Sequence, residues 1–105
     1  MGERTANITS GDIGITLNAL AQTISERQQQ MPKSSYTASL LADTNDLLCK
    51  KIVEEATEVI LAVKDCDHDH IRYEAADLLY HLLVLLKREG ISLGELAGEL
   101  NARMH

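Results

Sequence analysis

Apolar residues recur every three or four positions along most of the chain, which is the spacing of one face of an α-helix. In the first such segment, residues 12–30, they are Ile13, Leu17, Leu20, Ala21 and Ile24. The same spacing predicts two long helices, over residues 45–64 and 69–88, and shorter ones at 38–42 and from 92 to about 103. No segment alternates as a half-buried strand does, so the pattern predicts an all-α protein.

Residues typical of helix ends separate these segments. Asp43 or Thr44 is suited to cap the first long helix, and Ser92 opens a capping box at the start of the last helix. Gly90 is a natural left-handed stop. The polar stretch 65–68 leaves only a tight turn between the two long helices. We therefore expect an antiparallel helical hairpin, braced by the N-terminal and C-terminal helices.

Length and charge limit the possible classes of protein. A chain of 105 residues suits one domain, expected over residues 12–105 after a flexible tail at 1–11. A net charge of −6 and a pI near 5.1 argue against nucleic acid as a partner. The longest apolar run, 78–86, is too short to span a bilayer. Without a signal-peptide pattern, Cys49 and Cys66 are interpreted as reduced thiols of a cytoplasmic protein.

Two acidic groups lie one helix apart. The first long helix carries Glu54, Glu55 and Glu58, and the second carries Glu74 and Asp77 just before its most apolar stretch. Residues three or four apart share one helix face. Both groups lie at a similar distance from the turn, so the hairpin brings them together. Several converging carboxylates suit Mg²⁺ or Mn²⁺, which predicts a helical metal-dependent enzyme.

The alternative interpretation is a solvated charged face. Lys50 and Lys51 precede Glu54 and Glu55 by four positions, so both pairs could be ordinary surface ion pairs. Lysine before glutamate is the weaker order for an ion pair on a helix, which makes the interpretation as surface ion pairs less persuasive. His81, within the apolar run, is interpreted as a core histidine whose ring nitrogens form hydrogen bonds, since an oxygen-rich site prefers hard cations.

The acidic groups and three longer stretches resemble a known family. Residues 54–58 and 74–77 have the Glu-Glu-x-x-Glu and Glu-x-x-Asp pattern of MazG-like all-α nucleotide pyrophosphohydrolases. More narrowly, stretches 35–37, 50–59 and 73–86 resemble the phosphoribosyl-ATP pyrophosphohydrolases of histidine biosynthesis. The resemblance covers roughly residues 12–103, and one departure from the pattern is Val53, where glycine is expected.

This resemblance implies hydrolysis of phosphoribosyl-ATP to phosphoribosyl-AMP and pyrophosphate, the second step of histidine biosynthesis. The metal ligands it implies are Glu55, Glu58, Glu74 and Asp77. By the same resemblance, Glu54 could hold a further ion or orient the attacking water. Any carboxylate not committed to metal could act as the general base. The candidate substrate contacts are Lys50, Lys51 and Tyr36.

Assembly and two other functions remain open at this point. The helix over 69–88 is apolar around most of its circumference, so two chains are expected to form a homodimer that completes a MazG-like four-helix bundle. The same acids would serve a housekeeping enzyme that hydrolyses non-standard deoxynucleoside triphosphates. They would also suit a non-catalytic helical dimerisation module whose acids only face solvent.

Overall fold

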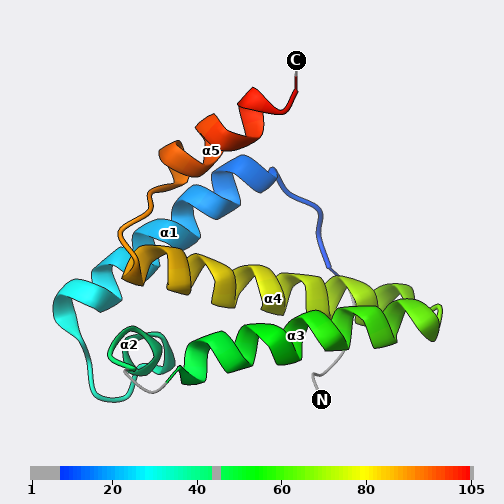
Figure 1. The fold of residues 1–105 in the computed structure, drawn as a ribbon, viewed down its shortest axis with the longest axis horizontal. Helices are drawn as coiled ribbons and strands as arrows, with labels where there is room; N and C mark the ends of the chain where they lie inside the picture. The colour runs from blue at the N-terminus through cyan, green and yellow to red at the C-terminus, as the bar shows by residue number, and fades with distance from the viewer. Residues whose placement is uncertain (1–7, 44–45, 105) are drawn as a thin grey trace. The chain divides into compact units, whose positions relative to one another are not determined.

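The computed structural model describes residues 8–43 and 46–104, and the regular structure within these ranges is helical (Figure 1). The helices are α1 (Ile13–Gln30), α2 (Tyr36–Leu41), α3 (Leu47–Lys64), α4 (His68–Arg88) and α5 (Leu93–Ala102). The prediction of an all-α fold is confirmed. The chain divides into two compact units. One contains α3 and α4 as far as Leu83, and the other contains α1, α2, the end of α4 and α5.

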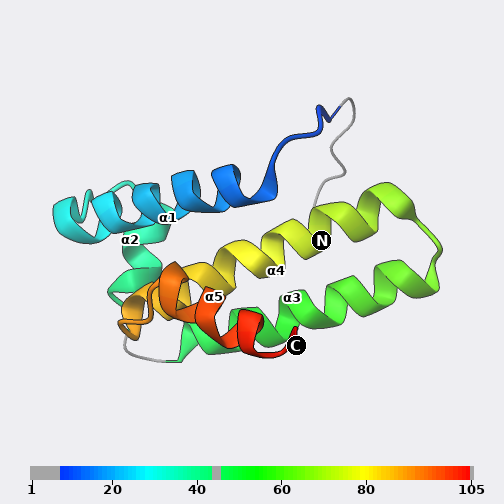
Figure 2. The ribbon, with the colours of Figure 1, turned by 90° about the horizontal axis from the view of Figure 1, so that it is seen from above.

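The first unit is the predicted antiparallel hairpin. Figures 1 and 2 show α3 and the first part of α4 side by side, running in opposite directions. The connection is short because Asp65 ends α3 and Cys66 adopts a left-handed φ of 55°. Asp67 then accepts a hydrogen bond at 3.2 Å from the backbone N–H of His70, which satisfies one of the free donors in the first turn of α4.

The start of α3 differs from the prediction. The helix was expected to begin near Asn45 with Asp43 or Thr44 as its cap, but its N-cap is Asp46, in a left-handed conformation with φ 59°. Asp43 still contributes from outside the helix, because its carboxylate accepts a hydrogen bond from the backbone N–H of Leu48 at 3.2 Å. Thr44 and Asn45 lie outside the described residues.

In the second unit, side-chain caps determine where α1 and α2 begin. Asp12 accepts from the backbone N–H of Ile15 at 3.0 Å and starts α1. Ser35 accepts from the backbone N–H of Ala38 at 3.1 Å and starts α2, two residues earlier than the apolar pattern alone predicts. Contacts join α1 to α2, and Ile24 of α1 is buried.

The end of α4 and the start of α5 follow the prediction closely. Gly90 has a φ of 78°, and the backbone N–H of Ile91 donates to the carbonyl of Leu86 at 2.8 Å. This is the hydrogen-bond pattern of a left-handed helix stop. Ser92 then accepts from the backbone N–H of Glu95 at 3.0 Å, which confirms the predicted cap of α5.

Other predictions about the fold are not tested. The flexible tail at residues 1–11 falls largely outside the described residues, and the single domain over 12–105 stays a prediction. The same holds for the bracing of the hairpin by the terminal helices. Within the described ranges, none of the helices combines the length and the apolar character that crossing a membrane requires.

Two glycines provide a matched test of the backbone. Gly90→Ala should lower the free energy of unfolding by about 1 kcal/mol, because alanine is strained at a positive φ. Gly98→Ala, within α5, should raise it by up to about 1 kcal/mol, because alanine is the better helix former. Neither new methyl group meets an atom within 4 Å, so the comparison isolates backbone conformation. Urea unfolding followed by circular dichroism measures both changes, and equal effects would contradict the left-handed stop.

Candidate functional site

A pocket of about 340 Å³ lies on the hairpin between α3 and α4. Its lining residues are Lys51, Glu54, Glu55, Glu58, Tyr73, Glu74 and Asp77. All five acids that the sequence predicts as one cluster are among them. The short turn at 65–67 therefore places the two acidic groups at matching heights, as the hairpin geometry requires.

Two of these acids are buried, which makes the site more than a charged surface. Glu74 is 1% exposed and Glu55 is 5% exposed. A buried carboxylate is costly unless another group compensates its charge. Glu55 meets the ammonium group of Lys51 at 3.3 Å, one turn earlier on α3. Glu74 meets His70 at 2.9 Å, one turn earlier on α4.

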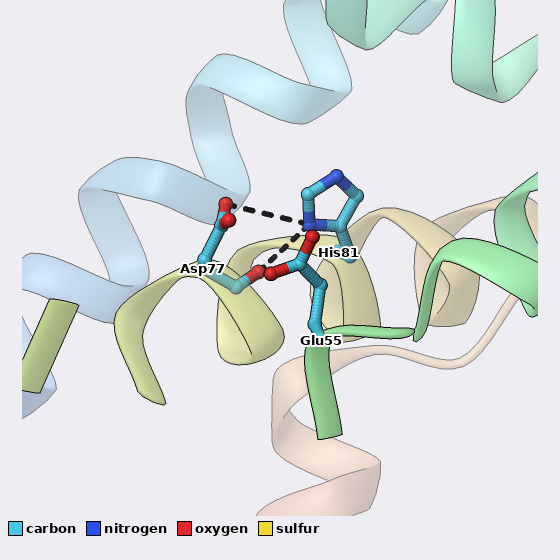
Figure 3. A group of neighbouring side chains, drawn as sticks. All are labelled: Glu55, Asp77 and His81. Carbon is cyan, nitrogen blue, oxygen red and sulfur yellow. Dashed lines mark hydrogen bonds and ion pairs between the residues drawn. The ribbon is translucent and has the colours of Figure 1, made fainter. Parts of the chain in front are cut away.

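One group of possible metal ligands joins the two helices. Figure 3 shows Glu55 of α3 reaching toward Asp77 and His81 of α4. One ligand atom from each of the three lies within 4.8 Å of the others. His81 is 2% exposed, and its Nδ1 lies 2.8 Å from the backbone carbonyl oxygen of Asp77 and 3.6 Å from the carboxylate of the same residue. This confirms that His81 is a buried hydrogen-bonding histidine.

A second group lies nearer the turn of the hairpin. It consists of Glu58 from α3 with His70 and Glu74 from α4, again with ligand atoms within 4.8 Å of one another. His70 is 2% exposed, and its Nε2 lies 2.9 Å from Oε2 of Glu74. The four acids predicted as metal ligands are thus divided between the two groups, two in each.

The donor atoms suit a divalent cation. Each group offers two carboxylates and one imidazole, and all four carboxylates line the pocket. Carboxylate oxygen is the ligand that Mg²⁺ and Mn²⁺ prefer. A cation would also relieve the repulsion between carboxylates that converge from two helices. The geometry therefore fits metal-assisted chemistry on an anionic substrate.

Comparison with known proteins decides the family. The sequence profile described as phosphoribosyl-ATP pyrophosphohydrolase matches residues 17–104. The chain belongs to this family. The phosphoribosyl-ATP pyrophosphatase of Nitrosospira multiformis is 49% identical over 84 residues, which cover 80% of this chain and 69% of that protein. The one from Rhizobium rhizogenes is 46% identical over 90 residues, or 86% of each chain.

A bifunctional relative extends beyond the matched region. The histidine biosynthesis bifunctional protein HisIE of Bacillus subtilis is 44% identical over 101 residues, or 96% of this chain. The chain spans only 48% of that relative's length. Membership of the phosphoribosyl-ATP pyrophosphohydrolase family makes the chain a hydrolase, and it confirms the resemblance that the acidic pattern indicated.

Two residues at or next to the pocket of this family member were not predicted to belong to the site. Tyr73 lines the pocket beside Glu74, and His70 contacts Glu74 directly. A usable indication for His70 was its position four residues before Glu74, since such pairs meet on a helix. His81 stands four residues after Asp77 in the same way. Neither spacing alone distinguishes a buried partner from a solvated one.

Three other predicted positions have a weaker connection to the pocket. Lys50 is exposed and is not one of its lining residues. Tyr36 belongs to the second unit and is 52% exposed. The roles of Lys50 and Tyr36 in substrate binding stay predictions. Val53, where the family pattern has glycine, is 66% exposed and does not line the pocket, so its side chain takes no room there.

A divalent cation should stabilise the native chain. Binding to the native state alone adds about 4 kcal/mol at a thousandfold excess over Kd. Thermal unfolding in chelator and in increasing magnesium chloride should give a rising Tm. Glu58→Gln should reduce the shift, while Asp65→Asn, an exposed acid outside the pocket, should keep it. Superimposed melting curves for the unmodified chain would rule out the site.

Proposed function

We propose that this chain hydrolyses phosphoribosyl-ATP to phosphoribosyl-AMP and pyrophosphate in the cytoplasm, the second step of histidine biosynthesis. The observation that carries the proposal is the pocket on the hairpin, where five carboxylates converge in a member of this family. Water must attack between the α- and β-phosphates, so the site has to bind a polyphosphate despite its own negative charge. Carboxylates manage this by holding cations.

The cation we propose is Mg²⁺, with Mn²⁺ as a substitute. Its ligands would be Glu55, Glu58, Glu74 and Asp77, which offer hard oxygen atoms from both helices. When bound, such a cation neutralises the charge that develops on the departing pyrophosphate. Burial of Glu55 and Glu74 supports this assignment, because it excludes a role for these two carboxylates on a solvated surface.

Glu54 is the carboxylate we propose for the attacking water. It lines the pocket, yet among the described residues it belongs to neither group of possible metal ligands. Its exposed carboxylate remains available to accept a proton. In this role Glu54 orients a water molecule toward the α-phosphate and takes its proton as the new P–O bond forms and the bond to the departing pyrophosphate breaks.

Lys51 is the cationic side chain that lines the pocket. Its ammonium group lies 3.3 Å from Glu55, and its side chain is 38% exposed, so it reaches solvent from the pocket wall. We propose that it contacts the substrate phosphates. Lys50 and Tyr36 are proposed as further substrate contacts, on the resemblance of their stretches to the family pattern.

We also propose that two chains pair as a homodimer through α3. Val53, Ile60 and Val63 lie on one face of this helix and are 66%, 57% and 53% exposed. Large apolar side chains gathered on one face favour a protein partner over water. Pairing two hairpins along this face gives a four-helix bundle, which supports the two-fold assembly.

Replacing Asp77 separates the chemistry from the fold. Asp77→Asn keeps the side-chain size but removes one negative ligand, so kcat for pyrophosphate release should fall about 10²-fold or more. Asp65→Asn makes the same chemical change at an exposed position and should leave the rate near normal. Assays use phosphoribosyl-ATP and a panel of deoxynucleoside triphosphates. Near-normal turnover by folded Asp77→Asn would refute the ligand set, and preference for the panel would refute the substrate.

The proposed dimer has its own test in two neighbouring residues. Ile60→Glu should dissociate the dimer at micromolar concentration, because a charge would be buried at the interface. Leu61→Glu is the control, since Leu61 is 50% exposed but lies about 100° further around the helix. Sedimentation equilibrium measures the mass of both variants. A folded monomer for the unmodified chain would contradict the proposal.

A further inference from the structure

His70 and Glu74 form a deeply buried pair of polar side chains within the described part of the hairpin. The two side chains are 3% and 1% exposed, and Nε2 of His70 lies 2.9 Å from Oε2 of Glu74. A contact of this length between buried groups is a well-formed hydrogen bond. His70 is itself held in place, because its backbone N–H donates to the carboxylate of Asp67 at 3.2 Å.

We propose that His70 is a positioning residue that holds the Glu74 carboxylate for the cation. The inference rests on the proposed function, which makes Glu74 a metal ligand. By donating from Nε2 to one oxygen, His70 fixes the rotation of the carboxylate and leaves the other oxygen for the cation. Removing a group that orients a metal ligand in this way commonly weakens metal binding by about 10–100-fold.

The other ring nitrogen determines which proton the imidazole carries. Nδ1 of His70 is buried and has no hydrogen-bond partner within the described part of the chain. A proton on Nδ1 alone would leave a buried donor without an acceptor and would direct the lone pair of Nε2 at the Glu74 oxygen. A proton on Nε2 avoids both penalties. His70 is therefore a donor toward Glu74.

The burial of Nδ1 also indicates that His70 acts through Glu74 and does not bind the cation itself. A histidine that binds metal usually donates its other N–H to a carboxylate, carbonyl or water. Coordination through Nε2 would give Nδ1 a proton with no acceptor. Coordination through Nδ1 is opposed by burial, because protein atoms cover that nitrogen almost completely.

Amide side chains of two lengths test the proposal. His70→Gln carries an N–H donor on a side chain long enough to reach Glu74 one turn away, whereas in His70→Asn the donor is one methylene shorter. Binding of Mn²⁺ to each purified chain is measured by isothermal titration calorimetry, and circular dichroism verifies folding. We expect His70→Asn to weaken binding about 10-fold or more and His70→Gln to remain within about threefold of the unmodified chain. His68→Asn, at an exposed neighbouring histidine, should bind as the unmodified chain does.

Turnover adds a second readout. At subsaturating Mn²⁺ the rate of His70→Asn should fall, and added Mn²⁺ should recover most of it with little change in the KM for phosphoribosyl-ATP. A defect in packing alone would not be recovered by the cation. If folded His70→Asn binds Mn²⁺ normally, or if His70→Gln binds as weakly as His70→Asn, the proposal is overturned.

The outcomes also distinguish this inference from the proposed function. If the unmodified chain hydrolyses phosphoribosyl-ATP and binds Mn²⁺ while every His70 variant matches it, only the role of His70 is wrong. If the unmodified chain binds no Mn²⁺, the metal site and the role of His70 are wrong together.

Discussion

The cost of burying carboxylates on two facing helices is the constraint on which the site depends. Glu55 and Glu74 are almost fully buried, and each has a partner four residues earlier on its own helix. Lys51 and His70 supply these partners. In both pairs the compensating group comes from the same helix as the acid, while the two carboxylates face the pocket between the helices. The pocket can then accept a cation from solvent.

This arrangement changes the meaning of the lysine that precedes Glu55. On an exposed helix, a lysine four residues before a glutamate stabilises the helix by only about 0.3 kcal/mol. Here the glutamate side chain is only 6% exposed, so removal of Lys51 would leave a buried charge with less compensation. The surface interpretation of the acidic pattern therefore fails for Glu55, and exposed Glu54 also lines the pocket.

Helix periodicity and capping residues predicted most of the fold because both act locally. The end of α4 at Arg88 and the cap at Ser92 were found where expected. The start of α3 was misplaced, since Asp43 reaches the helix from outside it. The convergence of the acids was predictable because a short turn leaves one register for the hairpin. The burial of His70 was not, since it depends on which neighbouring atoms cover that side chain.

The turn between α3 and α4 also affects how the site is assembled. Every residue that lines the pocket, and both groups of possible metal ligands, fall within residues 51–81. The contacts that create the pocket therefore join positions close together in the chain, and closing such short loops costs little entropy. Folds rich in local contacts form quickly. The geometry for chemistry can thus be reached early in folding, from a single contiguous stretch of the sequence.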